Sequence, residues 1–110
     1  MQKVTLFFED RPEITISMEV LINANGKLLF EGYDVGKMVG KTWGSTEYEY
    51  KYSVEPQELE KLYHAFNLRV GDTSGLLQSI KERFSVNEAY SLFGQFMRDH
   101  DVRFDSFIWP

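Results

Sequence analysis

The chain contains no cysteine, only two histidines and fewer basic than acidic residues, and each shortage narrows the range of possible functions. Without cysteine it can form no disulfide, no thiol nucleophile and no thiolate zinc site. Twelve Lys and Arg stand against seventeen Asp and Glu, and this net charge of -5 opposes binding to nucleic acid phosphates and to anionic lipids. No apolar run is long enough to span a bilayer or to resemble a signal peptide. We therefore expect a cytoplasmic protein that binds neither nucleic acid nor membrane.

The chain does have the size and apolar content of one globular domain. It has 110 residues, of which 43% are hydrophobic and 26% are charged. Apolar residues recur every second residue in the first half of the chain and about every 3.6 residues in the second half. This segregation favours an α+β fold over an alternating α/β fold. We predict a single α+β domain over residues 1–110. Its antiparallel sheet has four to five strands, an N-terminal meander plus a C-terminal strand, and three helices cover one face.

Alternating apolar and polar residues predict the strands. In residues 4–9 the pattern places Val4, Leu6 and Phe8 on one face, ahead of a turn at residues 10–12. Residues 14–22 give the clearest strand, with an Ile, Met and Val row toward the core. A third strand is expected from residue 28 to near Gly32, a fourth over residues 46–54, and a fifth within residues 102–109.

The connection between the second and third strands allows two hairpin registers. A two-residue loop at Asn25 and Gly26 would place Ile22 opposite Leu29. A three-residue loop, with Gly26 in the left-handed conformation, would place Ile22 opposite Leu28 and keep all the apolar residues on one face. We favour the three-residue loop.

Helix signals follow in the second half of the chain. Asp34 is predicted to cap a short helical turn in which Val35, Met38 and Val39 point inward. Pro56 opens a helix that ends near Asn67, and Asp72 or Thr73 caps the next. Ser85 and Glu88 match a capping box for a third helix. The predicted buried residues of these three helices are Leu59, Leu62, Tyr63, Phe66, Leu76, Leu77, Ile80, Phe84, Ala89, Tyr90, Phe93, Phe96 and Met97.

No residue set in the sequence predicts catalysis, cofactor binding or metal binding. His64 follows Glu60 by one helical turn, and His100 lies between two aspartates at a predicted helix end, so surface pairing accounts for both. Glu47 and Glu49 share one face of a strand, as paired catalytic carboxylates do, but Lys51 continues the row and a solvated charged face explains it. We expect no cofactor, and the residues favour a non-catalytic protein while leaving an enzyme open.

The excess of aromatic residues is the feature that points to an interaction. Nine Phe, six Tyr and two Trp exceed the needs of a core of this size. Both a core role and an interface role fit them, and alternating carboxylates favour a basic protein partner. The predicted interaction surface comprises Tyr33, Trp43, Glu47, Tyr48, Glu49, Tyr50, Tyr52 and Trp109.

Several short motifs resemble those of a family of small uncharacterised bacterial proteins with no established activity. They are residues 32–36 (GYDVG), Trp43-Gly44, residues 48–50 (YEY), the helix opened by a proline, and residues 107–109 (FIW) at the C-terminal end. The similarity spans most of the chain from position 20 onward. The resemblance implies a bacterial source and supplies no catalytic residues.

The expected function is that of a non-catalytic protein-interaction domain, one form of which is an immunity protein or antitoxin that blocks a basic toxin. The alternative is a small-molecule-binding protein or minor enzyme with a pocket between sheet and helices, using Tyr50, Trp43, Asp34 or His64. A third possibility is a homodimer that pairs through an edge strand within residues 3–9 or 103–109.

Overall fold

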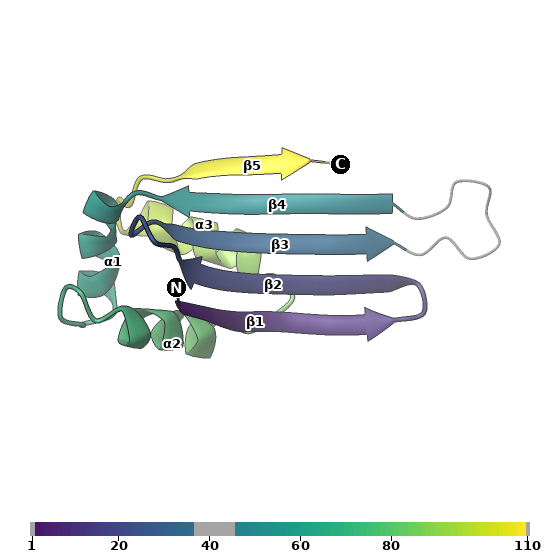
Figure 1. Cartoon of the computed structure of the whole chain (residues 1–110), viewed down its shortest axis with the longest axis horizontal. Coiled ribbons are helices and arrows are strands. Elements are labelled where there is room, and N and C mark those ends of the chain that lie inside the picture. The colour runs from purple at the N-terminus through teal and green to yellow at the C-terminus, as the bar shows by residue number, and fades with distance from the viewer. Residues whose placement is uncertain (1, 37–45, 110) are drawn as a thin grey trace.

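The computed structural model describes residues 2–36 and 46–109 and shows the predicted α+β class. Five strands form one antiparallel sheet in sequence order (Figure 1). The strands are β1 (Gln2–Arg11), β2 (Ile14–Ile22), β3 (Leu28–Gly36), β4 (Thr46–Val54) and β5 (Asp105–Trp109). The helices are α1 (Leu59–Ala65), α2 (Thr73–Phe84) and α3 (Ala89–Asp99), and a 3-10 turn, η1 (Pro56–Glu58), precedes α1. No helix in the described part of the chain has the length and apolarity that crossing a membrane requires.

The sheet has an inner face that carries the core and an outer face without helical cover. Figure 1 shows α3 behind β3 and β4, and α1 at one end of the sheet. The inner face contributes alternate residues of each strand, and the helices add their apolar stripes to the same cluster. The fully buried side chains at its centre are Val20, Leu28, Phe30, Val54, Leu62, Leu76, Leu77, Ile80, Phe93 and Met97. The predicted apolar row of β2 therefore does face the helices.

The β2–β3 hairpin has the register that the hydrophobic pattern favours. Ile22 pairs with Leu28 and Val20 with Phe30. Gly26 adopts a φ of 81°, and the Asn23 carbonyl accepts a hydrogen bond from its backbone N–H at 3.0 Å. The predicted three-residue loop with a left-handed glycine is confirmed, and it is what keeps the apolar row of β3 on the inner face.

In β1 a β-bulge overturns part of the predicted pattern. Thr5 pairs with Glu19 and Phe7 pairs with Met18, so Leu6 is the extra residue. The bulge keeps Leu6 in the core but moves every later side chain to the opposite face. As a result Phe8, predicted to face inward, lies on the outer face with 63% of its surface exposed.

The third strand is longer than predicted. Instead of ending near Gly32 and leading to a helical turn capped by Asp34, β3 continues to Gly36 and pairs with β2 and β4 along its whole length. Asp34 is therefore a strand residue, and its side chain is on the inner face with those of Leu28 and Phe30. The predicted helical residues Met38 and Val39 lie outside the described residues.

The helix termini agree with the sequence in one place and differ in another. Asp72 caps α2, and its side chain accepts a hydrogen bond from the Gly75 N–H at 3.0 Å. The predicted capping box of α3 is wrong: α3 begins at Ala89, Glu88 makes no side-chain capping bond, and the Ser85 hydroxyl donates instead to the Lys81 carbonyl. Because the Ser85 hydroxyl is bonded to the last turn of α2, it does not cap α3.

Phe93 occupies the centre of the core and offers a matched test of the helix face. Its ring is completely buried between Phe30, Tyr52 and Phe84, whereas the adjacent Leu92 is 48% exposed. Phe93→Ala should lower the free energy of unfolding by about 3–5 kcal/mol, and Leu92→Ala should change it by less than about 0.5 kcal/mol. Urea denaturation followed by circular dichroism measures both, and equal losses for the two variants would show that α3 presents another face to the sheet.

Candidate functional site

Strand β4 separates two surfaces that differ in chemistry. Its inner side chains are those of Tyr48, Tyr50, Tyr52 and Val54, and its outer side chains are those of Glu47, Glu49, Lys51 and Ser53. Tyr50 and Tyr52 are only 8% and 4% exposed, so the structure places these two residues of the predicted interaction surface in the core. Tyr33, Glu47, Glu49 and Trp109 share the outer face, while Tyr48 is exposed at the inner one. Trp43 lies outside the described residues.

Tyr52 and Tyr90 join β4 to α3. Their rings stack 4.0 Å apart and almost parallel, at 6°. The Tyr52 hydroxyl donates to the Tyr90 carbonyl at 2.9 Å, and the Tyr90 hydroxyl donates to the Lys51 carbonyl at 3.1 Å. A Cβ at Gly94 would lie 2.1 Å from the Tyr52 hydroxyl oxygen, so the approach of helix to strand depends on that glycine. These contacts fix the position of the first turns of α3 over the sheet.

Gly32 and Tyr50 are partners across β3 and β4, and they place Asp34. The Tyr50 ring lies directly over Gly32, where an added Cβ would come within 1.8 Å of Cε2. From this position the Tyr50 hydroxyl donates to Asp34 Oδ1 at 2.6 Å. A glycine within a strand destabilises the sheet less when a cross-strand aromatic ring covers it. The glycine therefore has a packing role in the middle of β3, not the strand-ending role expected of it.

Around this pair the inner face opens into a cavity of about 260 Å³, which we call the inner cavity. It lies where α3 begins and the sheet continues beyond the helix. Met18, Tyr50 and Ile108 come from one row across the sheet, and Asp34 and Tyr48 pair in the next row. The lining residues are Met18, Asp34, Tyr48, Tyr50, Asn87, Glu88, Tyr90, Ser91 and Ile108.

Two phenols of the inner cavity, those of Tyr50 and Tyr90, keep their protons across the physiological range. Burial, together with the hydrogen bond to Asp34, raises the pKa of Tyr50 far above its usual value of 10.0. Burial also raises the pKa of Tyr90 to about 12, with the neighbouring Tyr52 adding to the effect. Both side chains therefore act as neutral hydrogen-bond donors, and the negative charge of the cavity resides on Asp34 and Glu88.

The outer face carries a row of aromatic side chains that crosses the sheet. Phe8, Ser17, Tyr33, Glu49 and Trp109 follow one another from β1 to β5 through successive pairings. Phe107 lies next to Trp109, and their rings stack at 5.7 Å and 10°. We call Phe8, Tyr33, Phe107 and Trp109 the outer aromatic surface.

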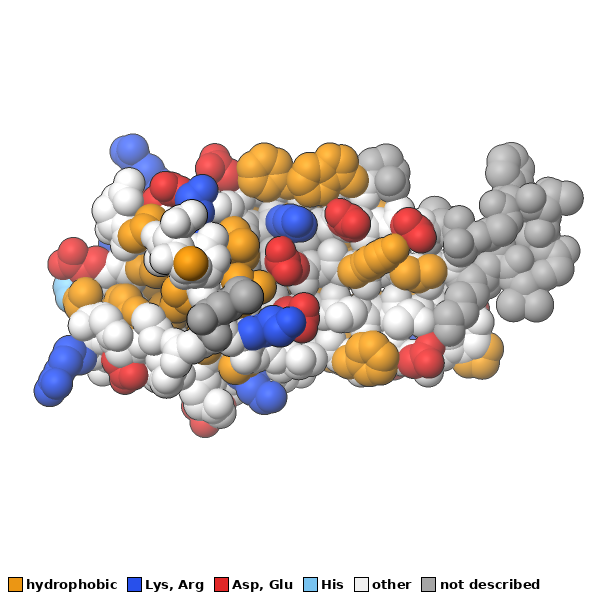
Figure 2. Space-filling view, in the orientation of Figure 1, with side chains coloured by type: hydrophobic (Ala, Val, Ile, Leu, Met, Phe, Trp, Pro, Cys, Tyr) orange, Lys and Arg blue, Asp and Glu red, His pale blue; other side chains and the backbone are white. Residues whose placement is uncertain are grey.

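The exposed side chains of this surface lie on both edge strands of the sheet, Phe8 on β1 and Phe107 and Trp109 on β5. Phe107 is 44% and Trp109 is 47% exposed, and every residue of β5 is exposed. Figure 2 shows apolar side chains along β5, with acidic and basic side chains beside them. An apolar strand at a sheet edge leaves backbone and ring surface available to another chain.

Carboxylates predominate on the outer face. The charged residues at its outward strand positions are Asp10, Glu19, Glu31, Glu47, Glu49, Asp105, Lys3 and Lys51. Lys3 pairs with Glu19 at 3.3 Å and Lys51 with Glu31 at 3.7 Å. Burial and the nearby Glu47 and Glu49 raise the pKa of Tyr33, which is the response of a phenol to a negative environment.

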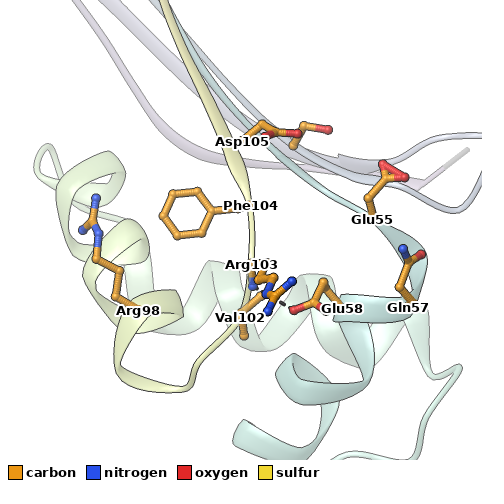
Figure 3. A pocket seen from close by; sticks show the side chains of 9 residues that line it. Glu55, Gln57, Glu58, Arg98, Val102, Arg103, Phe104 and Asp105 are labelled. Atoms are coloured by element: carbon orange, nitrogen blue, oxygen red, sulfur yellow. Dashed lines mark hydrogen bonds between the residues drawn. The ribbon is translucent and has the colours of Figure 1, made fainter.

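A second, wider hollow of about 580 Å³ lies between β5, the start of α1 and the end of α3 (Figure 3). Its charged groups already serve the fold. Glu58 Oε1 accepts hydrogen bonds from the Arg103 N–H at 2.8 Å and from Lys61 at 2.9 Å, and the first of these contacts contributes most to lowering the pKa of Glu58. Arg98 lies 5.5 Å from the centre of the Phe104 ring. This hollow holds the chain that leads to β5 and is the weaker candidate for a ligand site.

Neither histidine belongs to a site. His64 is exposed at the end of α1 without a hydrogen bond or ion pair to Glu60. His100 packs against the Phe96 ring at 4.4 Å. Among residues 2–36 and 46–109, no group of three metal-ligating side chains lies close enough together to hold a metal ion.

Sequence reasoning found part of the inner cavity. Asp34 and Tyr50 were named for a pocket between sheet and helices, and both line the cavity, although Asp34 was also expected to cap a helix. Tyr90 was expected only as a buried helix residue and Ile108 was not singled out, whereas both also line the cavity. The alternation of Leu28, Phe30, Gly32 and Asp34, continued through the glycine, was the available signal for Asp34. Nothing local signals Tyr90, because its role depends on the distance at which α3 packs.

Comparison with known proteins finds no family model, no curated protein and no solved structure that matches this chain. Support for a function therefore comes from the two faces of β4, which carry the inner cavity and the outer aromatic surface.

The contact between Gly32 and Tyr50 predicts a coupled pair of substitutions. Gly32→Ala should destabilise the protein by about 1–3 kcal/mol, because the new methyl group displaces the Tyr50 ring. In a Tyr50→Ala background the same change should cost at least about 1 kcal/mol less, because the obstructing ring is absent. Urea denaturation of the four proteins of this double-mutant cycle gives the coupling energy. Additive losses would mean that the ring does not lie over Gly32.

Proposed function

We propose that this protein is a non-catalytic protein-interaction domain that binds a basic partner protein through the outer aromatic surface and β5. The observation that supports this most is the stacked pair of Phe107 and Trp109, two large side chains half exposed on the edge strand β5. Aromatic residues contribute most of the binding energy in many interfaces, because they bury a large area at a small entropic cost.

The charges around the stacked pair favour a basic partner. Glu49 pairs across the sheet with Trp109, and Asp105 lies two residues from Phe107. Neither carboxylate forms an ion pair within the described part of the chain. Carboxylates around an apolar centre accelerate encounter with a cationic surface and reject anionic ones. Blocking a basic toxin, as an immunity protein or antitoxin does, is the specific form that we propose.

The same charges disfavour a second copy of this chain as the partner. Pairing two β5 strands across a two-fold axis at Phe107 would place Asp105 of one copy opposite Trp109 of the other, on the side where Glu49 neighbours Trp109, in a chain whose net charge is -5. Like charges in contact cost binding energy, whereas a basic chain added to the same edge gains it.

The inner cavity supports a second candidate function, small-molecule binding. Its two carboxylates and three tyrosines surround one partly apolar space, which is the usual composition of a ligand site. This candidate uses the opposite face of β4 and therefore does not compete with the first.

Variants of the outer aromatic surface test the proposed interaction. The tagged protein is used to capture partners from the lysate of its native host, in parallel with the double variant Phe107→Ala/Trp109→Ala and with Leu92→Ala, which removes an equally exposed apolar side chain from α3. A partner should be retained by the wild type and by Leu92→Ala and lost with the double variant. Once purified, it should be basic, and its dissociation constant should increase about tenfold or more on the double substitution.

The dissociation constant should also increase with salt concentration, since outer carboxylates contribute to binding. Two results contradict the proposal. One is that all three proteins retain the same set of partners. The other is that the wild type retains none and is a monomer by light scattering.

A further inference from the structure

The composition of the inner cavity identifies a class of ligand. Among the described residues its lining contains three tyrosines, two apolar side chains and two carboxylates, and no Lys, Arg or His. Aromatic rings attract a cation through the negative potential of their faces, and carboxylates attract it directly. We infer that the inner cavity binds an organic cation with a primary ammonium group, held by Asp34 between the rings of Tyr48, Tyr50 and Tyr90. This inference rests on the second candidate function and not on the outer aromatic surface.

Asp34 is positioned in advance for such a contact. Tyr50 occupies Oδ1 through its 2.6 Å hydrogen bond, and Oδ2 accepts none from the described residues. The hydrogen bond fixes the rotation of the carboxylate without neutralising its charge, because the phenol is a neutral donor. One oxygen therefore remains to accept an ammonium N–H, and ordering it costs no entropy on binding.

The rings around Asp34 are held as rigidly as the carboxylate. Tyr50 is packed over Gly32, and the Tyr90 ring meets the Tyr50 ring edge to face at 4.9 Å. The Tyr90 hydroxyl and backbone carbonyl both form hydrogen bonds to β4. Tyr48 is the exception. It is 47% exposed and lies across from Asp34, so it is the ring that can close over a bound cation.

The partial positive charge at the start of α3 disfavours a cation in the cavity, whereas the carboxylates favour one. A helix N-terminus carries about half a positive elementary charge, and Ser91 and Asn87 of the lining lie near that end. Asp34 and Glu88 carry two full negative charges at the same cavity. The net charge of the described lining is therefore negative, and an anion would meet the carboxylates without a cationic side chain from the described residues to bind it.

The size of the cavity limits the ligand to a short chain. A volume of about 260 Å³ lies just below the range of about 300–1,000 Å³ typical of drug-sized ligands. A butylammonium ion fits this limit and has the same length as a lysine side chain beyond Cα. The ligand could thus be a free amine or a lysine of a protein, and both share the group that Asp34 recognises.

Amide NMR with n-butylammonium chloride tests the inference at constant ionic strength. The ion should cause saturable shifts at Asp34, Tyr48, Tyr50 and Tyr90, and n-butanol, which has the same chain without the charge, should bind at least about tenfold more weakly. Asp34→Asn should weaken butylammonium binding by about tenfold or more, and Tyr48→Leu, which keeps apolar bulk but removes the ring, by about threefold or more.

Glu49→Gln is the matched control, because it removes one carboxylate from the opposite face of the sheet. It should change the dissociation constant by less than about twofold, since solvent and salt screen that charge. A lysine tripeptide with blocked ends separates the two sources: tighter binding than butylammonium indicates a protein lysine, and weaker binding indicates a free amine. The inference is overturned if no saturable shift occurs, if n-butanol binds equally well, or if Asp34→Asn has no more effect than Glu49→Gln.

A negative result here leaves the proposed interaction untouched, because Phe107 and Trp109 project from the other face. Conversely, the double variant at those positions should still bind butylammonium as the wild type does.

Discussion

Strand β4 lies between β3 and β5, and the two-residue period of its side chains is the constraint on which both candidate surfaces depend. Side chains of even number project toward α3, where Tyr50 and Tyr52 are buried, and those of odd number project outward, where Glu47, Glu49 and Lys51 meet solvent. A shift of one residue in its pairing would bury the charges and expose the tyrosines. Three contacts fix the register: the Tyr50 ring over Gly32, the Tyr50 hydroxyl on Asp34, and the stack of Tyr52 on Tyr90.

These contacts also explain why the inner face can contain both a core and a cavity. The hydroxyls of Tyr52 and Tyr90 donate to backbone carbonyls across the boundary between α3 and β4, so the polar tips of the buried Tyr52 ring and the partly buried Tyr90 ring are satisfied. Phe30, Phe84 and Phe93 pack behind them. Because α3 begins only at Ala89, the sheet beyond it keeps an opening at Asp34 and Tyr48. The position of α3 therefore explains both the packed core at one end of the helix and the inner cavity at the other.

The sequence predicted the parts of the fold in which local pattern and tertiary packing agree. The row of β2, the alternation of β4, the Gly26 hairpin and the Asp72 cap were all predictable, since each is decided by residues within a few positions of one another. The predictions failed where residues distant in the sequence determine the local structure. Nothing in the adjacent Leu6, Phe7 and Phe8 tells which of them is the bulge. Gly32 and Asp34 both disfavour a strand by propensity, and the Tyr50 side chain of another strand overrides that preference. For the candidate sites, the aromatic and acidic residues of the outer face were predictable in part, and of the inner cavity Tyr50 and Asp34 were named from the sequence but Tyr90 and Ile108 were not.

The division of the β4 tyrosines between solvent and core is the central claim, and nitration with tetranitromethane followed by peptide mass spectrometry tests it most directly. In the folded protein Tyr48, at 47% exposure, should be modified, whereas Tyr50 at 8% and Tyr52 at 4% should be protected. All three should react once the protein is unfolded in urea. Modification of Tyr50 or Tyr52 in the folded protein as rapidly as Tyr48 would contradict the assignment of the two faces, and with it the inner cavity and the outer aromatic surface.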